Sequence, residues 1–197
     1  MTITTEQIKA LREETGISIM LCRKALEEAG GNIEKAKVIL QRRGAAAAEK
    51  KADRSLGAGT IAAYIHHSGA VGALVELASE TDFVSGNEAF RALAYDIAMH
   101  VAASRPEFIT RENVSEDTLM RAREVFAKEA EGKPKEMREK ILEGKLNSYL
   151  AEKILLDQPF IKNPDQTIRS LIEQATQKFG EKIAVTRFAR FATGNRA

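Results

Sequence analysis

TIAAYIHHSGAVGALVEL, residues 60–77, decides the fold of this 197-residue chain. Two short runs with β-branched residues, 60–66 and 71–77, flank the turn-forming letters HSGA, which is the pattern of a β-hairpin. A third run, EKIAVTRFARFAT at 181–193, has the Val, Ile, Thr and Phe enrichment of a strand and no helical stripe. The other segments follow helical periods, so the sequence predicts an α+β fold in which helices cover a small antiparallel sheet.

The N-terminal segment is predicted to form three short helices. Their starts are marked by Thr4 or Thr5, by Ser18 and by Asn32. Their ends are marked by Gly16, by Gly30 and Gly31, and by Gly44. Apolar residues recur at helical spacing in each helix, so we expect a bundle that is only marginally stable by itself, as docking modules often are.

Charge divides the chain near residue 54. Residues 1–54 carry 11 basic and 8 acidic side chains, whereas residues 55–110 carry 2 basic and 6 acidic ones. AAAAEKKADRS, residues 45–55, consists of strong helix formers with charged ends and predicts a helical tether. We therefore expect a helical docking bundle with the start of its tether at 1–54 and an α+β core at 55–197.

The middle of the core is predicted to be mostly helical. A loop at 79–86 leads to Asn87, a candidate cap for a long helix that ends before Pro106. The starts of three further helices are predicted at Ser115, Pro134 and Asp165. These helices supply the layer that would cover the sheet.

Composition narrows the classes of function. A net charge of +2 is too balanced for bulk attraction to a nucleic acid. The single cysteine, Cys22, excludes an internal disulfide framework and fits a reducing compartment. No stretch approaches the roughly 18 apolar residues of a membrane span, and the N-terminus lacks a targeting pattern. We expect a cytoplasmic chain that contacts no membrane and no nucleic acid directly.

The candidate chemical groups form no constellation for catalysis. Cys22 lies in a helical stripe without a neighbouring histidine and is expected to be a packed residue. His66 and His67 are adjacent in a predicted strand, where their side chains point to opposite faces and cannot share a metal. His100, on a mostly apolar helix, is expected to be a partnered structural residue. We therefore predict a protein that binds other proteins, with no metal, no cofactor and no enzymatic activity.

One tetrapeptide follows the predicted hairpin within the loop. Thr81-Asp82-Phe83-Val84 places a carboxylate beside a large aromatic residue among polar and small neighbours. On local grounds Asp82 could cap a turn and Phe83 could pack under the next helix. The tetrapeptide also matches the best-known functional motif of the bacterial elongation factor Ts family, and the chain resembles that family, the guanine-nucleotide exchange factors for elongation factor Tu.

The resemblance extends over nearly the whole chain. LREETGISIMLCRKALEEAGGNIEKA, from residue 11, resembles the family's ubiquitin-associated-like docking bundle. YIHHSGAVGALVELASETDFV, from residue 64, resembles its first core hairpin and exchange loop. DIAMHVAASRPEFI, EKILEGKL, QPFIKNP and IAVTRFARF follow in the order of the family. The length is similar to that of the short members, which carry one core copy instead of two.

The resemblance implies a mechanism of nucleotide exchange. The loop would push Phe83 between elements of Tu near its metal site, while Asp82 would perturb the surrounding polar network and the Mg²⁺ would be displaced. Thr81 and Val84 complete this predicted Mg²⁺-dislocation loop. The partner implied is elongation factor Tu, both GDP-bound and nucleotide-free.

The resemblance also implies contacts from the bundle to the GTPase domain. Their candidates are Leu11, Arg12, Met20 and Arg23. Leu11 and Met20 could instead belong to the bundle core, and the two arginines could be ordinary solvent-facing charges. Ile19 departs from the family, which commonly has methionine there, so a contact made by that methionine is not carried over.

A single core copy predicts a homodimer, because long relatives grip Tu with two related core halves and a second chain would supply the other half. The candidate interface in the last strand is Phe188, Ala189 and Phe191, unless that strand is covered. Two functions from other classes remain as alternatives. One is an RNA- or ribosome-binding adaptor, and the other is an enzyme with an unrecognised cleft.

Overall fold

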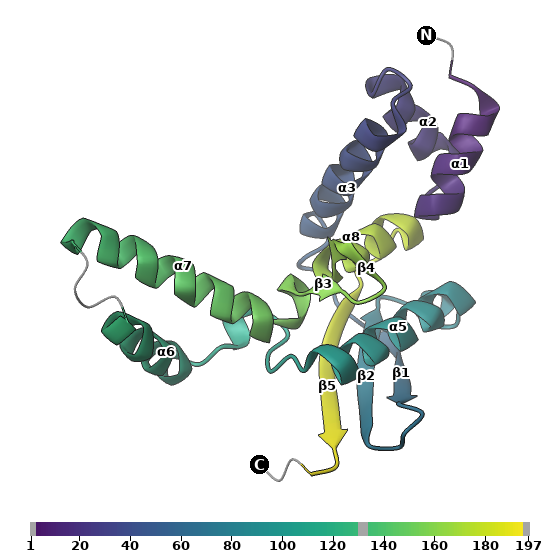
Figure 1. Ribbon diagram of the computed structural model, residues 1–197. Coiled ribbons are helices and arrows are strands. Elements are labelled where there is room, and N and C mark those ends of the chain that lie inside the picture. The colour runs from purple at the N-terminus through teal and green to yellow at the C-terminus, as the bar shows by residue number, and fades with distance from the viewer. Residues whose placement is uncertain (1–2, 130–133, 195–197) are drawn as a thin grey trace.

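A three-stranded antiparallel sheet forms the centre of the molecule (Figure 1). The computed structural model describes residues 3–129 and 134–194. Its sheet has the order β1-β2-β5, with β1 at Ala58–Ile65, β2 at Val71–Ser79 and β5 at Ala184–Ala192. The predicted hairpin, the predicted last strand and the α+β class are therefore confirmed.

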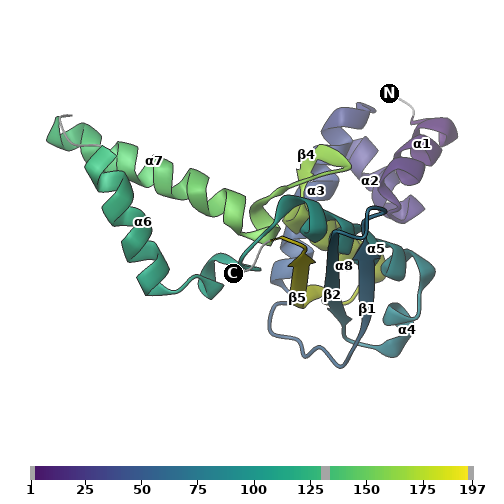
Figure 2. The same ribbon diagram turned by 60° about the horizontal axis from the view of Figure 1, so that its bottom comes forward.

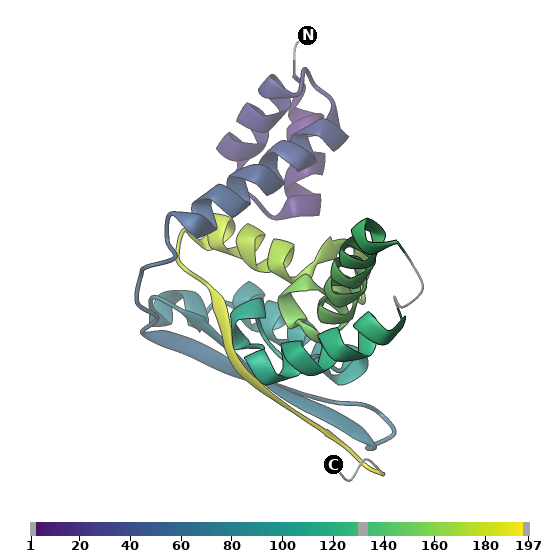
Figure 3. The ribbon, with the colours of Figure 1, turned by 90° about the vertical axis from the view of Figure 1, so that its left-hand side faces the viewer.

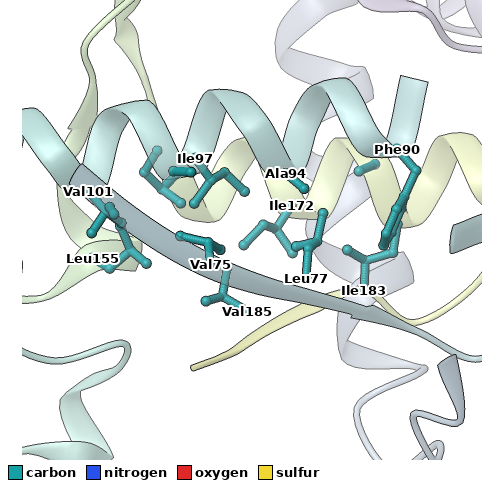
Figure 4. Close-up of a cluster of buried hydrophobic side chains, with 14 of the residues drawn as sticks. Val75, Leu77, Phe90, Ala94, Ile97, Val101, Leu155, Ile172, Ile183 and Val185 are labelled. Atoms are coloured by element: carbon teal, nitrogen blue, oxygen red, sulfur yellow. The ribbon is translucent and has the colours of Figure 1, made fainter. Parts of the chain in front are cut away.

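The helices that the structure describes cover one face of this sheet. α5 (Glu88–Ser104) packs along β1 and β2, and α8 (Ile168–Phe179) lies between the sheet and the N-terminal helices (Figure 3). Val75, Leu77 and Val185 point from the strands into this layer and meet apolar side chains of α5 and α8 (Figure 4). In the described part of the chain no helix covers the other face.

The N-terminal helices form a bundle with its own apolar cluster. The helices are α1 (Thr5–Thr15), α2 (Ile19–Glu28) and α3 (Ile33–Glu49). Thr4, Ser18 and Asn32 each accept a hydrogen bond from a backbone N–H of the first turn that they cap, as the sequence predicted. Cys22 is fully buried in this cluster, and the expectation of a packed residue is confirmed.

α3 does not end at Gly44, so that predicted boundary is wrong. The helix runs on to Glu49 because the alanines that follow are strong helix formers. Gly44 is buried against α8, where a Cβ atom would lie 3.3 Å from the Glu173 carbonyl oxygen. The glycine therefore allows close approach of two helices instead of ending one.

The predicted loop at 79–86 is more ordered than expected. Ser79 is still part of β2, and Asp82–Ser85 form a single helical turn, α4. Asn87 caps α5 as predicted: its side chain accepts a hydrogen bond from the Ala89 N–H at 2.9 Å. The turn is thus held between a strand and a capped helix.

α6 (Glu116–Glu129) and α7 (Lys135–Lys153) form an arm that stands off the core (Figures 1 and 2). The arm has its own apolar cluster, which includes Leu146 and Leu150. Short 3₁₀ helices at Arg111–Asn113 and Leu155–Asp157 flank it.

The start predicted at Asp165 is wrong. Asp165 lies in β4 (Asn163–Thr167), which pairs with β3 (Pro159–Phe160), and α8 begins at Ile168. Thr167 is the cap, because its Oγ1 accepts the Ser170 N–H at 3.1 Å. Aspartate and threonine can both cap a helix, so the sequence did not distinguish Asp165 from Thr167. The β3–β4 hairpin has no clear alternation of apolar and polar residues that would have revealed it.

The histidines divide into a buried one and an exposed pair. β1 ends before His66, so the rings of His66 and His67 do not point to opposite faces of a strand; their centroids lie 4.1 Å apart. His100 is fully buried, with its Nε2 2.9 Å from Gln158 Oε1, which confirms a partnered structural residue.

We expect the free energy of unfolding to fall as the pH drops below about 6.5, which is the ordinary pKa of a histidine side chain. Burial lowers the pKa of His100 and outweighs the opposing effect of the Gln158 hydrogen bond, so the unfolded chain takes up a proton before the folded chain does. Urea unfolding at pH 7.5 and 5.5 measures this loss. The decrease in the free energy of unfolding between the two pH values should be smaller in His100→Gln than in wild type. An equal decrease in both proteins would contradict the role of His100.

Candidate functional site

The α4 turn presents an aromatic side chain to solvent. Phe83 is 86% exposed, more than any other large apolar side chain of the described residues. Thr81 is extended before the turn, and the Gly86 N–H closes it by donating to the Asp82 carbonyl oxygen at 2.8 Å. Phe83 therefore does not pack under α5, which was the local alternative.

The tetrapeptide is divided between surface and core. Thr81, Asp82 and Phe83 are exposed, whereas Val84 is only 4% exposed and joins the main apolar cluster. One helical turn points adjacent side chains in different directions, so burying Val84 directs Phe83 outward. Val84 anchors the turn and offers no surface to a partner, which corrects its prediction as a contact.

Hydrogen bonds tie this turn to the segment before β5. Thr81 donates from its N–H and from its Oγ1 to the two carboxylate oxygens of Glu181, at 3.0 and 2.6 Å. Ser79 Oγ donates to the Thr81 carbonyl oxygen at 2.9 Å. Phe83 thus projects from a fixed base. The sequence did not predict Glu181 as part of this site, because it lies 100 positions from Thr81.

The candidates in the bundle are divided in the same way. Leu11 is fully buried in the bundle cluster, so it has no surface for a partner and the alternative of a core residue applies. Met20 is 67% exposed at the start of α2, and Ile19 beside it is also exposed. Arg12 is exposed, and Arg23 is exposed while its Nε donates to Glu27 at 2.9 Å.

The start of α2 and the α4 turn both lie near the C-terminal end of α8. A Cβ atom at Gly16, just before α2, would lie 3.3 Å from Lys178 Nζ, and Thr81 bonds to Glu181 three residues further on. The start of α2 and the α4 turn therefore border one stretch of chain.

The open face of the sheet is the third exposed surface. Ala189 and Phe191 point to this face, and they pair across β5 and β2 with Leu74 and Gly72. Phe188 is half-buried against the main core, so it does not belong to this face, which corrects its place in the predicted interface.

The described residues bring no three His, Cys, Asp or Glu side chains together in a way that could hold a metal ion. Burial raises the pKa of the Cys22 thiol, although a hydrogen bond with Thr15 opposes this, so the reactive thiolate is disfavoured. None of the helices within 3–129 and 134–194 is long and apolar enough to cross a membrane.

An exposed aromatic turn beside a bundle with an exposed methionine is typical of proteins that dock on other proteins. Residues 37–195 match the sequence model of a family described as Elongation factor TS. The chain belongs to the elongation factor Ts family.

Curated relatives agree over nearly the full length. Elongation factor Ts of Thermodesulfovibrio yellowstonii is 48% identical, with 98% of each chain covered. That of Acetivibrio thermocellus is 47% identical over 98% of this chain and 90% of the relative. That of Coprothermobacter proteolyticus is 44% identical over 98% of this chain and its own full length. The resemblance seen in the motifs is therefore confirmed.

Proposed function

We propose that this chain promotes release of GDP from elongation factor Tu by inserting Phe83 near the bound Mg²⁺. Family membership supports the exchange role. The observation that carries the mechanism is the 86% exposure of Phe83 on a turn fixed by Val84 below and by Glu181 at its side. A rigid exposed aromatic supplies a large contact area at low entropic cost.

The chemistry of the GTPase explains why such a wedge would work. A GTPase holds GDP largely through its phosphates and through a Mg²⁺ that bridges protein and β-phosphate oxygens. Moving the protein groups around that ion removes its ligands and therefore weakens the binding of GDP. Asp82, exposed beside Phe83, would compete for the polar partners in that network. A chain with this role in translation would be located in the cytoplasm.

The bundle is proposed to supply docking affinity through Arg12, Met20 and Arg23. Its three capped helices around one apolar cluster support the proposal of a ubiquitin-associated-like module, which the family resemblance implies. Exposed methionine beside arginine is typical of binding surfaces, because the thioether adapts its shape and the guanidinium pairs with carboxylates. Leu11 contributes by packing the bundle.

Replacing Met20 and Arg23 together with alanine should raise the concentration of chain needed for half-maximal GDP release about tenfold. The maximal rate should stay the same, because the α4 turn is untouched. Titration of the release rate measures both quantities. Met120→Ala, which removes another exposed methionine from α6, is the matched control. A half-maximal concentration equal to that of wild type would exclude the bundle surface.

The open sheet face is proposed to be the surface of a homodimer. Three cross-strand rows lie on it: Ile61, Glu76 and Arg187; Ala63, Leu74 and Ala189; Ile65, Gly72 and Phe191. Ile65 and Phe191 are 71% and 70% exposed. Side chains of this size on one face form a patch that a second copy would bury, and a two-fold pair is the commonest closed arrangement.

Thermodynamic linkage provides a test of the exchange role. If the chain weakens GDP binding to Tu, GDP must weaken binding of the chain by the same factor. Calorimetry of the chain with nucleotide-free Tu and with GDP-saturated Tu gives the two affinities. We expect clearly weaker binding to the GDP form. Equal affinities would show that the chain does not act on the nucleotide site.

A further inference from the structure

Two carboxylates link the α4 turn and the segment before β5 in both directions. Glu181 accepts hydrogen bonds from the N–H and the Oγ1 of Thr81. Glu80, the neighbour of Thr81, accepts the N–H of Lys182, the neighbour of Glu181, at 2.6 Å. We refer to Glu80 and Glu181 as the reciprocal clamp. It joins segments that lie about half the chain apart.

The tether that follows α3 is fixed to the same clamp. Arg54 Nη1 lies 3.2 Å from both carboxylate oxygens of Glu80. Lys182 Nζ donates to the carbonyl oxygens of Ala52 and Arg54, the latter at 2.9 Å. The backbone also approaches closely, because a Cβ at Gly57 would lie 3.0 Å from the Glu80 carbonyl oxygen. Tether, turn and the segment before β5 thus meet at one point.

Charge strengthens this junction. The Lys182 N–H, assisted by the Arg54 guanidinium, lowers the pKa of Glu80, so the carboxylate is ionised at neutral pH. Hydrogen bonds to an ionised acceptor are shorter and stronger than those to a neutral one. The side chain of Glu80 is 21% exposed, so water competes with these bonds only in part.

We propose that Glu80 and Glu181 are positioning residues for nucleotide exchange, which hold Phe83 at a fixed place relative to the tether of the docking bundle. This inference rests on the proposed function of the α4 turn. Phe83 can act on the Mg²⁺ site only if its position is fixed when the chain docks. A displacement of about 1 Å at such a group can lower the rate of the step it promotes. Because the clamp binds both the tether and the turn, docking by the bundle would deliver Phe83 to one location.

Glu181→Gln tests this role with little change in volume. Its amide can accept only one of the two bonds from Thr81 and places an NH₂ group against the other donor. We expect the maximal rate of GDP release to fall about fivefold, while the half-maximal concentration changes by less than about twofold. Glu129→Gln, which removes a carboxylate paired with Lys145 in the arm, is the matched control and should behave as wild type.

The same substitution in a Phe83→Ala background separates positioning from general stability. If Glu181 acts through Phe83, Glu181→Gln should have no further effect once the aromatic ring is gone. A fivefold loss in both backgrounds, or no loss in the wild-type background, would overturn the inference. The proposed function itself fails in a different way, namely if Phe83→Ala alone promotes GDP release as fast as wild type.

Thermal unfolding of each variant checks that folded proteins are being compared. Glu80→Gln serves as a second variant, for which we expect the same pattern of release rates in the two backgrounds.

Discussion

Replacing Phe83 with alanine is expected to lower the maximal rate of GDP release from Tu by at least about tenfold. The ring is 86% exposed, so its removal takes little from the core, and Val84 still anchors the turn. What is lost is the contact that would disturb the Mg²⁺ site. Release of fluorescent GDP at saturating chain measures the effect.

Asp82→Ala should slow release less than Phe83→Ala, because the carboxylate perturbs the network while the ring opens it. Val125→Ala, which trims an exposed apolar side chain on α6, is the control for nonspecific loss of surface. Thermal unfolding should be nearly unchanged in all three proteins. If the double variant of Asp82 and Phe83 matched wild type in release rate, the assignment of the wedge would be wrong.

Replacing Ala189 with aspartate should convert a homodimer into a monomer. Ala189 lies in the central row of the open face, opposite Leu74 on β2. In a two-fold pair the substitution places two like charges near the axis and buries them in an apolar patch, which is costly. Light scattering at micromolar concentration should give the mass of two 21.7 kDa chains for wild type and of one for the variant.

Ala127→Asp, on the exposed side of α6, makes the same chemical change in the arm and should leave the dimer intact. The variant at Ala189 should still fold, because its side chain points away from the core. A wild-type monomer with full exchange activity would contradict the dimer. It would leave the proposed role of Phe83 unaffected.

Local chemistry allowed much of the fold to be predicted from the sequence. Thr4, Ser18, Asn32 and Asn87 cap helices where the sequence placed them, because a short polar side chain satisfies free N–H groups at a helix start. The β1–β2 hairpin and β5 were predicted from β-branched and aromatic residues. Such signals depend on neighbours in the chain, which the sequence displays directly.

Features that depend on distant partners were missed. Gly44 resembled a helix end, but its role is set by α8, which lies about 130 positions further on. The motif Thr81–Val84 was found as a unit, yet only the packed structure separates buried Val84 from exposed Phe83. Leu11 was a candidate both for the docking surface and for the bundle core, and only the packed bundle shows that it is buried. The reciprocal clamp joins residues about 100 positions apart, and no local pattern indicates such a pair.

The central claim is tested most directly by stopped-flow release of fluorescent GDP from Tu, chased with excess unlabelled nucleotide, with and without wild-type chain. We expect the release rate to rise with chain concentration to a plateau at least about a hundredfold above the rate of Tu alone. Chelation of Mg²⁺ should raise the rate of GDP release from Tu alone. It should also reduce the acceleration by the chain, because the ion that the chain is proposed to displace is then already absent. A release rate independent of the chain at saturating concentration would contradict the account.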